Sequence, residues 1–317
     1  MLCSTGGNAR CAHRFVPVCV VNSISIMSVK QWKASMSAKG ALKAVRRRSG
    51  DFFARRSPSY LLGTVGFILA VIILLMPSPY VIETPGPTQN VLAKSGATSV
   101  ISVSGGKTYK DKGSLLLVTV NAQGIPGYPV TNLQVIASWF SRHADVIPRE
   151  AVVPTGQTLD QYQKENKAEM SGSQSAAESQ ALAFLKAKGI DTSGYSIKMH
   201  VDNIGGPSAG MMYTLGAIDL FTPQNESGGK TIAGTGTMDT TGKVGAIGGI
   251  RLKMLGALRD GATWFLAPAS NCDEVVGHIP SGLHVVKVST ISNAYSSLVT
   301  IGQGKGDTLP QCTASQK

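Results

Sequence analysis

The sequence predicts a single α/β (α+β) domain preceded by one apolar helix. Short β-like runs alternate with helical segments through residues 99–303, with no internal repeat, and a helix-length apolar run precedes them. Charge divides along the chain: residues 1–58 hold 11 Lys and Arg against one Asp, while the remaining 19 basic and 17 acidic residues nearly cancel. Because the main domain is almost neutral, its composition argues against nucleic-acid binding.

The first element is an apolar segment without a charged residue from Ser57 to Ile82. Its length and all-round apolar character predict a transmembrane helix over residues 59–77. Arginines cluster before it, which predicts a basic tail over residues 1–58 on the cytoplasmic side and the main domain outside the cytoplasm in a single-pass arrangement. A cleaved signal peptide fits less well, because the leading tail is long and no small-x-small cleavage site follows.

The segment after the helix is rich in proline, with Pro77, Pro79, Pro85 and Pro87 close together. This composition predicts an extended stalk over residues 78–98. The domain itself is expected to span residues 99–303, and residues 304–317 read as a polar tail.

Within the domain, β-like runs and helical runs follow one another. Strands are expected at 100–103, 115–121 and 195–201, and at the runs ATWFLAP and LHVVKV, with a hairpin in TIAGTGTMDTTGKVGAIGG. Helices are expected within 155–188 and in the runs AGMMYTLGAIDLF, IRLKMLGALRDG and SNAYSSLVT. Residues 133–140 fit either a helix or a strand.

The motif GGPSAG at residues 205–210 opens one of these helices and places Ser208 at its start. A helix N-terminus presents free backbone N–H groups and a partial positive charge, which stabilise an oxyanion. Ser208 therefore fits a nucleophile, with the backbone of Gly206, Ser208 and Ala209 as the oxyanion site. The alternative is a serine that only caps the helix.

The same motif matches G-x-S-x-G of the α/β-hydrolases, which would need an Asp and then a His downstream. Asp260 or Asp273, with His278 or His284, supply that order. The match is short, and the proline before the serine suits a sharply strained turn poorly.

A serine nucleophile can also use a lysine base. Lys253 lies in VGAIGGIRLKMLGAL, among apolar and small residues. To act near neutral pH its pKa must fall by roughly 3 units, which burial can achieve. The alternative is a solvent-facing lysine on an amphipathic helix.

The two motifs together resemble the Lon protease family: GGPSAG at 205–210, then TGTMDTTGKVGAIGGIRLKM at 235–254. The resemblance implies a Lon proteolytic-domain-like fold with Ser208 as nucleophile and Lys253 as base. It implies that Thr235 lies beside this dyad and that Arg251 takes the first basic position after the Gly-Gly pair. It also implies protein or peptide substrates and makes a hexameric ring plausible.

The similarity is greatest to membrane-anchored, PDZ-containing Lon-like proteins of bacteria, through the segments IETPGP, GSLLLVTV and FLAPASNC. Only residues 190–204 occupy the place of the PDZ domain, which is too short for a domain. Gly205 stands where many Lon proteases have an acidic residue. The two Gly-Lys-Thr triplets, 106–108 and 229–231, lack the first glycine of a nucleotide-binding loop, so no ATP is expected.

The prediction is therefore an ATP-independent serine endopeptidase acting on unfolded or flexible protein segments. A non-catalytic, membrane-anchored binding or assembly module is the alternative, motivated by the missing PDZ segment. No cofactor or metal is expected, because no cysteine pair has zinc-type spacing. Outside the cytoplasm two cysteines usually pair, which predicts a Cys272–Cys312 disulfide.

Overall fold

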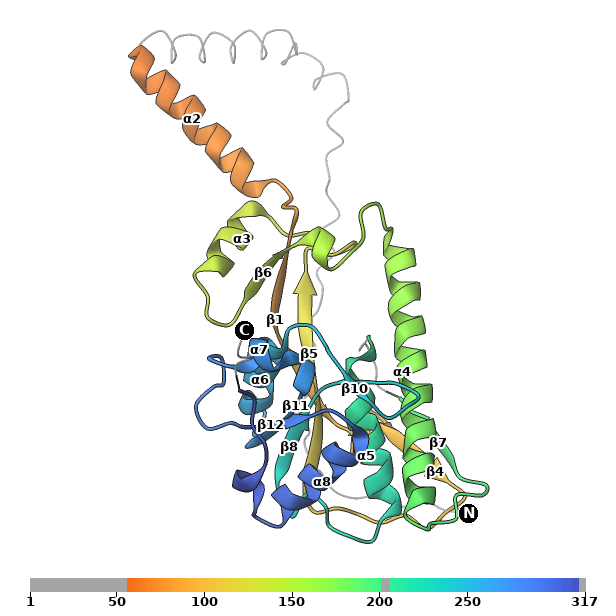
Figure 1. Ribbon diagram of the computed structural model, residues 1–317. Helices are drawn as coiled ribbons and strands as arrows, with labels where there is room; N and C mark the ends of the chain where they lie inside the picture. Colours follow the sequence, from red (N-terminus) through yellow and green to blue (C-terminus); the bar gives the residue numbers. More distant parts are fainter. Residues whose placement is uncertain (1–55, 201–205, 314–317) are drawn as a thin grey trace, which may run out of the picture. The chain divides into compact units, whose positions relative to one another are not determined.

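The computed structural model describes residues 56–200 and 206–313 (Figure 1). Its α-helices are α2 (Pro58–Leu75), α3 (Asn132–Trp139), α4 (Leu159–Ala187), α5 (Gly210–Phe221), α6 (Ile250–Arg259), α7 (Cys272–Val275) and α8 (Ile291–Gly302). Its strands are β1 (Tyr80–Asn90), β2 (Lys94–Ser95), β3 (Thr98–Ser99), β4 (Ile101–Ser104), β5 (Ser114–Gln123), β6 (Asp145–Pro148), β7 (Ser196–Met199), β8 (Thr231–Gly234), β9 (Thr237–Met238), β10 (Val244–Gly245), β11 (Trp264–Pro268) and β12 (His284–Val288). Residues 1–55 of the basic tail lie outside the described residues.

A six-stranded mixed sheet organises the domain, in the order β12-β11-β8-β5-β1-β6. The strands from β12 to β5 are parallel, and β1 pairs antiparallel with both β5 and β6. The smaller pairs are β2–β3, β4–β7 and β9–β10. The mixed α/β architecture predicted from the sequence is confirmed.

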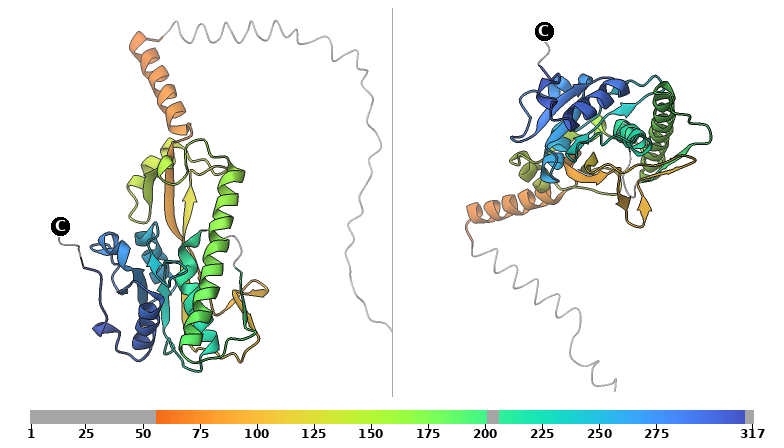
Figure 2. Two further views of the ribbon diagram at one scale, coloured as in Figure 1. Left: turned by 45° about the vertical axis from the view of Figure 1, so that its right-hand side comes forward. Right: turned by 90° about the horizontal axis from the view of Figure 1, so that it is seen from below.

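Helices cover both faces of the sheet (Figures 1 and 2). One core packs alternate strand residues such as Leu115 and Leu117 against α4, α5 and α8. The other packs the intervening residues, such as Leu116 and Val118, against α6 and α7. This alternation follows from the period of two in a strand, and it explains why β5 is apolar on both faces.

The helix α2 is the candidate membrane segment. It has a mean hydropathy of 2.2, and none of its side chains is buried within the protein. Its length and composition are sufficient to cross a bilayer. The chain divides into two compact units within this helix, after Ile68.

The proline-rich segment after α2 differs from the expected stalk. Residues 80–90 are extended, as prolines favour, but they form β1 inside the six-stranded sheet. The ladder with β5 is interrupted between Pro85 and Thr88, where the register shifts. Such a bulge accommodates Pro87, because its missing N–H group falls where pairing is already broken, and Pro85 is the last residue paired before the interruption.

Several other elements settle expectations left open by the sequence. Residues 132–139 form a helix, α3, whose N-cap Thr131 makes a capping box with Gln134. The expected hairpin in residues 231–249 is smaller than anticipated, because β8 joins the parallel sheet and only β9 and β10 form the hairpin. Strand β4 pairs with β7, which lies beyond α4 in the chain.

Candidate active site

Ser208 lies in a 3₁₀ turn, Pro207–Ala209, that leads directly into α5. Gly206 precedes it with φ 92°, a backbone conformation that side chains rarely adopt. Ser173 of α4 donates a hydrogen bond to the Pro207 carbonyl at 2.8 Å. The turn is therefore held from the α4 side, while Ser208 remains half-buried.

The chain that follows β8 binds the other side of this turn. The Ser208 carbonyl accepts hydrogen bonds from the Gly236 N–H at 2.8 Å and from the Thr235 hydroxyl at 3.1 Å. The Met211 N–H in turn donates to the Gly236 carbonyl at 3.1 Å. These bonds join the two sequence motifs in space, although they are separated by the whole of α5.

Lys253 reaches the same place from the first turns of α6. Its side chain is buried, and Nζ donates to the Thr235 hydroxyl at 3.5 Å. Thr235 is fully buried and thus contacts both Lys253 and the Ser208 backbone. No hydrogen bond joins the Ser208 hydroxyl to Nζ within the described residues.

Burial lowers the pKa of Lys253 to about 8, against a weaker opposing effect of the Glu83 carboxylate. A buried ammonium loses hydration, and this loss favours the neutral amine. Lys253 is therefore a lysine that can exchange a proton near neutral pH.

Glu83 of β1 is the functional neighbour that the sequence analysis missed. Burial raises its pKa, the charge of Asp145 raises it further, and the ammonium of Lys253 lowers it. Its carboxylate also lies beside the start of α6, because a Cβ added at Gly249 would lie 3.2 Å from Oε2. Glu83 lies within IETPGP, so only the strand character of this segment could have indicated that it faces α6.

Arg251 has a positioning role distinct from that of Lys253. Its guanidinium forms an ion pair with Asp145 of β6 at 2.5 Å and also donates to the carbonyls of Arg142 and Ala144. These contacts fasten the start of α6 to the edge strand of the sheet. An arginine provides the forked donor geometry that such a cluster of acceptors requires.

Two of the residues proposed for a Ser-His-Asp arrangement, Asp260 and His284, make other contacts. Asp260 accepts hydrogen bonds from Arg259 and Thr88. His284 stacks on Trp264. In the part of the chain that the structure describes, no hydrogen bond connects His278 or His284 to Ser208.

The two cysteines of the domain, Cys272 and Cys312, form a disulfide. It joins the start of α7 to the C-terminal tail, which also pairs with β12 through the Lys287 N–H and the Pro310 carbonyl at 2.9 Å. The tail is thus fixed to the domain at two points.

Comparison with known proteins assigns the class. The model of the Lon protease (S16) C-terminal proteolytic domain matches residues 136–300, which is 165 of the 317 residues. Lon protease 2 of Herpetosiphon aurantiacus is 32% identical over 160 residues, 47% of this chain and 19% of that protein. Lon protease of Citrifermentans bemidjiense is 37% identical over 102 residues, 29% of this chain and 13% of that protein. A mitochondrial Lon protease homolog of Candida albicans is 38% identical over 96 residues, 29% of this chain and 9% of that protein.

The fold and these matches define a serine peptidase domain. The chain belongs to the Lon protease (S16) family. It spans at most about a fifth of the length of each of these curated relatives. The family match begins within α3, so β5 and β1, which lie between β8 and β6 in the sheet, fall outside the matched residues.

Proposed function

We propose that this chain is a membrane-anchored, ATP-independent serine endopeptidase with Ser208 as nucleophile and Lys253 as base. The observation that carries the proposal is the hydrogen-bonded connection from the Lys253 amine through the Thr235 hydroxyl to the Ser208 backbone. It joins a buried amine of lowered pKa to a half-buried serine at a helix start. All three residues lie in the region matched by the family.

The chemistry begins with a neutral Lys253, which at pH 7 is about a tenth of the population for a pKa near 8. The amine takes the Ser208 proton as the hydroxyl oxygen attacks a peptide carbonyl. Because Nζ and the Ser208 hydroxyl are not hydrogen-bonded at rest, the side chains must approach by rotation when substrate binds, as is common in resting enzymes. Thr235 holds the ammonium that results.

The tetrahedral oxyanion is then stabilised by backbone N–H groups of Gly206, Ser208 and Ala209 at the start of α5, where the helix dipole adds to the hydrogen bonds. The Lys253 ammonium returns its proton to the leaving amine. Water hydrolyses the acyl-enzyme, with Lys253 again as the base.

The substrates that fit are unfolded or flexible protein segments. Neither Gly-Lys-Thr triplet forms a complete nucleotide-binding loop, so the chain itself supplies no ATP-driven unfolding. A homo-oligomeric ring, by analogy with the family, would restrict access further.

Anchoring through α2 is supported by its hydropathy and exposed side chains. Arg55 and Arg56 before the helix favour a cytoplasmic N-terminus, and the Cys272–Cys312 disulfide favours an oxidising compartment for the domain. Alkaline carbonate extraction of membranes tests the anchor, and trypsin added to intact cells tests which side the domain faces. Solubilisation of the chain by carbonate contradicts the membrane anchor. Protection of the domain from trypsin contradicts its location outside the cytoplasm.

The central experiment measures the rate of cleavage of an unfolded protein, such as reduced casein, by the full chain held in detergent micelles. The wild type is compared with the variants Ser208→Ala and Lys253→Met. Both variants should lose cleavage by about a thousandfold or more, because each removes a member of one catalytic unit. Ser292→Ala, which changes an exposed serine on α8, is the matched control and should retain activity. Equal cleavage by wild type and Ser208→Ala refutes the proposal and favours the non-catalytic module.

A further inference from the structure

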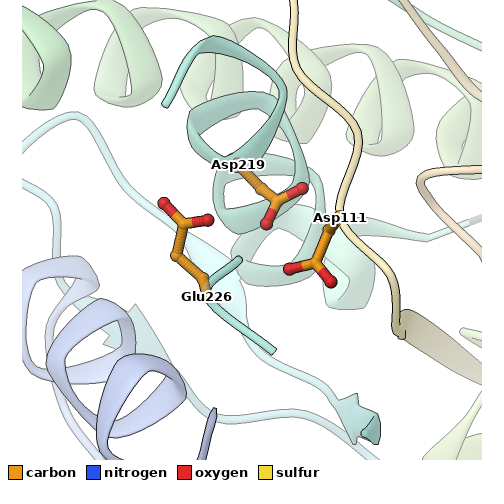
Figure 3. A group of neighbouring side chains, drawn as sticks. All are labelled: Asp111, Asp219 and Glu226. Atoms are coloured by element: carbon orange, nitrogen blue, oxygen red, sulfur yellow. The ribbon is translucent and has the colours of Figure 1, made fainter. Parts of the chain in front are cut away.

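Three carboxylates from distant parts of the chain meet at the end of α5 opposite to Ser208 (Figure 3). Asp111 lies in the loop before β5, Asp219 in the last turn of α5 and Glu226 in the loop before β8. Each offers an oxygen, and these oxygens lie within 4.8 Å of one another. Asp219 and Glu226 are each only 2% exposed.

The hydrogen bonds in this cluster leave three carboxylate oxygens without a donor. Asp111 accepts from the N–H groups of Gly113 at 2.7 Å and Ser227 at 2.9 Å. Oε1 of Glu226 accepts from the Tyr295 hydroxyl at 3.1 Å. Both oxygens of Asp219 and Oε2 of Glu226 are buried, and among the described residues no N–H or hydroxyl group donates to them, so their polar neighbours are the other carboxylates of the cluster. A buried carboxylate without a donor is strongly unfavourable in its charged form unless a cation or a proton compensates the charge.

In the part of the chain that the structure describes, no basic side chain forms an ion pair with these carboxylates. The ion pairs among the described residues involve Asp145, Asp260 and Asp307 and none of the three clustered carboxylates. The nearby Lys230 ammonium donates instead to the carbonyl of Gly302 at 3.3 Å. The helix dipole further disfavours a charged Asp219, because the C-terminal turn of α5 carries a partial negative charge.

We propose that Asp111, Asp219 and Glu226 bind a hard divalent cation, with Ca²⁺ preferred over Mg²⁺. Carboxylate oxygens without a cysteine or histidine are the ligand set of such ions. Oxygens on opposite sides of one Ca²⁺ lie about 4.6–5.2 Å apart, and those around Mg²⁺ about 4.0–4.2 Å apart. Separations within 4.8 Å bring all three carboxylates into reach of one ion, and burial of Asp219 and Glu226 favours Ca²⁺, because Mg²⁺ usually keeps several waters in its coordination shell.

Burial, together with the neighbouring carboxylates, raises the pKa of Asp219 to about 9. A proton is thus the competitor of the cation at this site. The two alternatives differ in a measurable way, because a protonated carboxyl group gives no response to added metal ions, whereas a metal site does.

The site has a structural consequence for the domain. A bound ion would tie the end of α5 to the loops that lead into β5 and β8, the adjacent parallel strands at the centre of the sheet. Asp219 lies 11 residues after Ser208, about 16 Å along a helix. The ion is therefore too far away to act on the scissile bond, and its binding is independent of the proposed peptidase chemistry.

The first test is a thermal unfolding titration of the EDTA-treated, dialysed full chain in detergent, followed by intrinsic fluorescence. At free Ca²⁺ about 100 times its Kd, the midpoint should rise by on the order of 5–10 °C, and by less in equal Mg²⁺. Na⁺ at matched ionic strength should give no comparable rise. No rise in either divalent ion overturns the proposal and leaves protonation as the compensating event.

Variants locate the ion. Asp219→Asn and Glu226→Gln should abolish the Ca²⁺-dependent rise. The midpoint of each variant without Ca²⁺ is measured as well, so that loss of the rise is distinguished from loss of the fold. Asp160→Asn, at an exposed position of α4, is the control that should keep the full rise. A rise that persists in both cluster variants overturns the assignment.

A direct readout does not depend on variant stability. Tb³⁺ bound beside Glu226 lies next to the Tyr295 ring, whose hydroxyl hydrogen-bonds that carboxylate. Excitation of tyrosine should therefore sensitise Tb³⁺ luminescence in the wild type, and Ca²⁺ should displace the signal. Absence of sensitised luminescence at saturating Tb³⁺ contradicts the site.

Discussion

Replacing Lys253 by methionine should make the folded domain more stable while abolishing the proposed catalysis. Burial lowers the pKa of this lysine from 10.5 to about 8. Each pKa unit corresponds to about 1.4 kcal/mol, so holding the charged amine in the folded state costs about 3 kcal/mol. Methionine fills a similar volume without this penalty, and the 3.5 Å hydrogen bond to Thr235 that it removes is weak.

The predicted gain in stability depends on pH, and the difference in proton binding between the folded and unfolded states determines its direction. Below about pH 8 lysine is protonated in both the folded and the unfolded protein, and the folded state bears the full penalty. Between about pH 8 and 10.5 the unfolded chain still binds the proton that the folded protein has lost, so wild-type stability rises with pH. The stability difference between Lys253→Met and wild type should therefore shrink across this interval.

Chemical denaturation of the full chain in detergent at pH 7 and at several values up to 10.5 measures both effects. The variant should gain up to about 3 kcal/mol at pH 7. Lys167→Met, at an exposed position of α4, is the control and should change stability by less than about 0.5 kcal/mol. A Lys253→Met variant less stable than wild type at pH 7, or a difference that stays constant with pH, refutes the reasoning.

Three further predictions concern the surroundings of Lys253 and the disulfide. The kcat/KM for cleavage should rise with pH through about 8, where Lys253 becomes neutral. Glu83→Gln should move this rise to lower pH, because it removes the carboxylate that raises the pKa of Lys253. An identical pH profile for the variant contradicts the interaction between Glu83 and Lys253. Arg251→Lys should destabilise the domain by about 1–3 kcal/mol in denaturant titrations, because lysine cannot make the forked contacts; an unchanged midpoint contradicts the positioning role. Reduction of Cys272–Cys312, which closes a separation of 40 residues, should cost up to about 4 kcal/mol in the same assay, and the double serine variant should show no effect of reductant.

The motif-bearing elements were predictable from the sequence because their signals are local. The apolar run after Ser208 predicts a buried helix, and α5 is buried along almost its whole length. The apolar residues around Lys253 left both a buried and a solvent-facing lysine open, and the structure shows this side chain 3% exposed. The connection of these elements through Thr235 followed from family resemblance rather than from the pattern of residues.

The remaining features depend on contacts between distant segments. The prolines around Glu83 favour an extended conformation, but only the bulged pairing with β5 makes that segment part of the sheet and places the carboxylate near Lys253. The cluster of Asp111, Asp219 and Glu226 is equally hidden, because two loops and a helix end contribute one carboxylate each. Sequence spacing carries no signal for either arrangement.

The connectivity of the central strands means that adjacent strands of the sheet are synthesised at widely separated times. Ser114 of β5 pairs with Thr231 of β8, so the apolar segment Leu115–Val118 leaves the ribosome long before its parallel neighbour exists. At about 5–20 residues per second this interval lasts roughly 6–23 seconds. During it the nascent chain exposes an apolar strand edge, so a chaperone that shields this edge should raise the yield of folded protein.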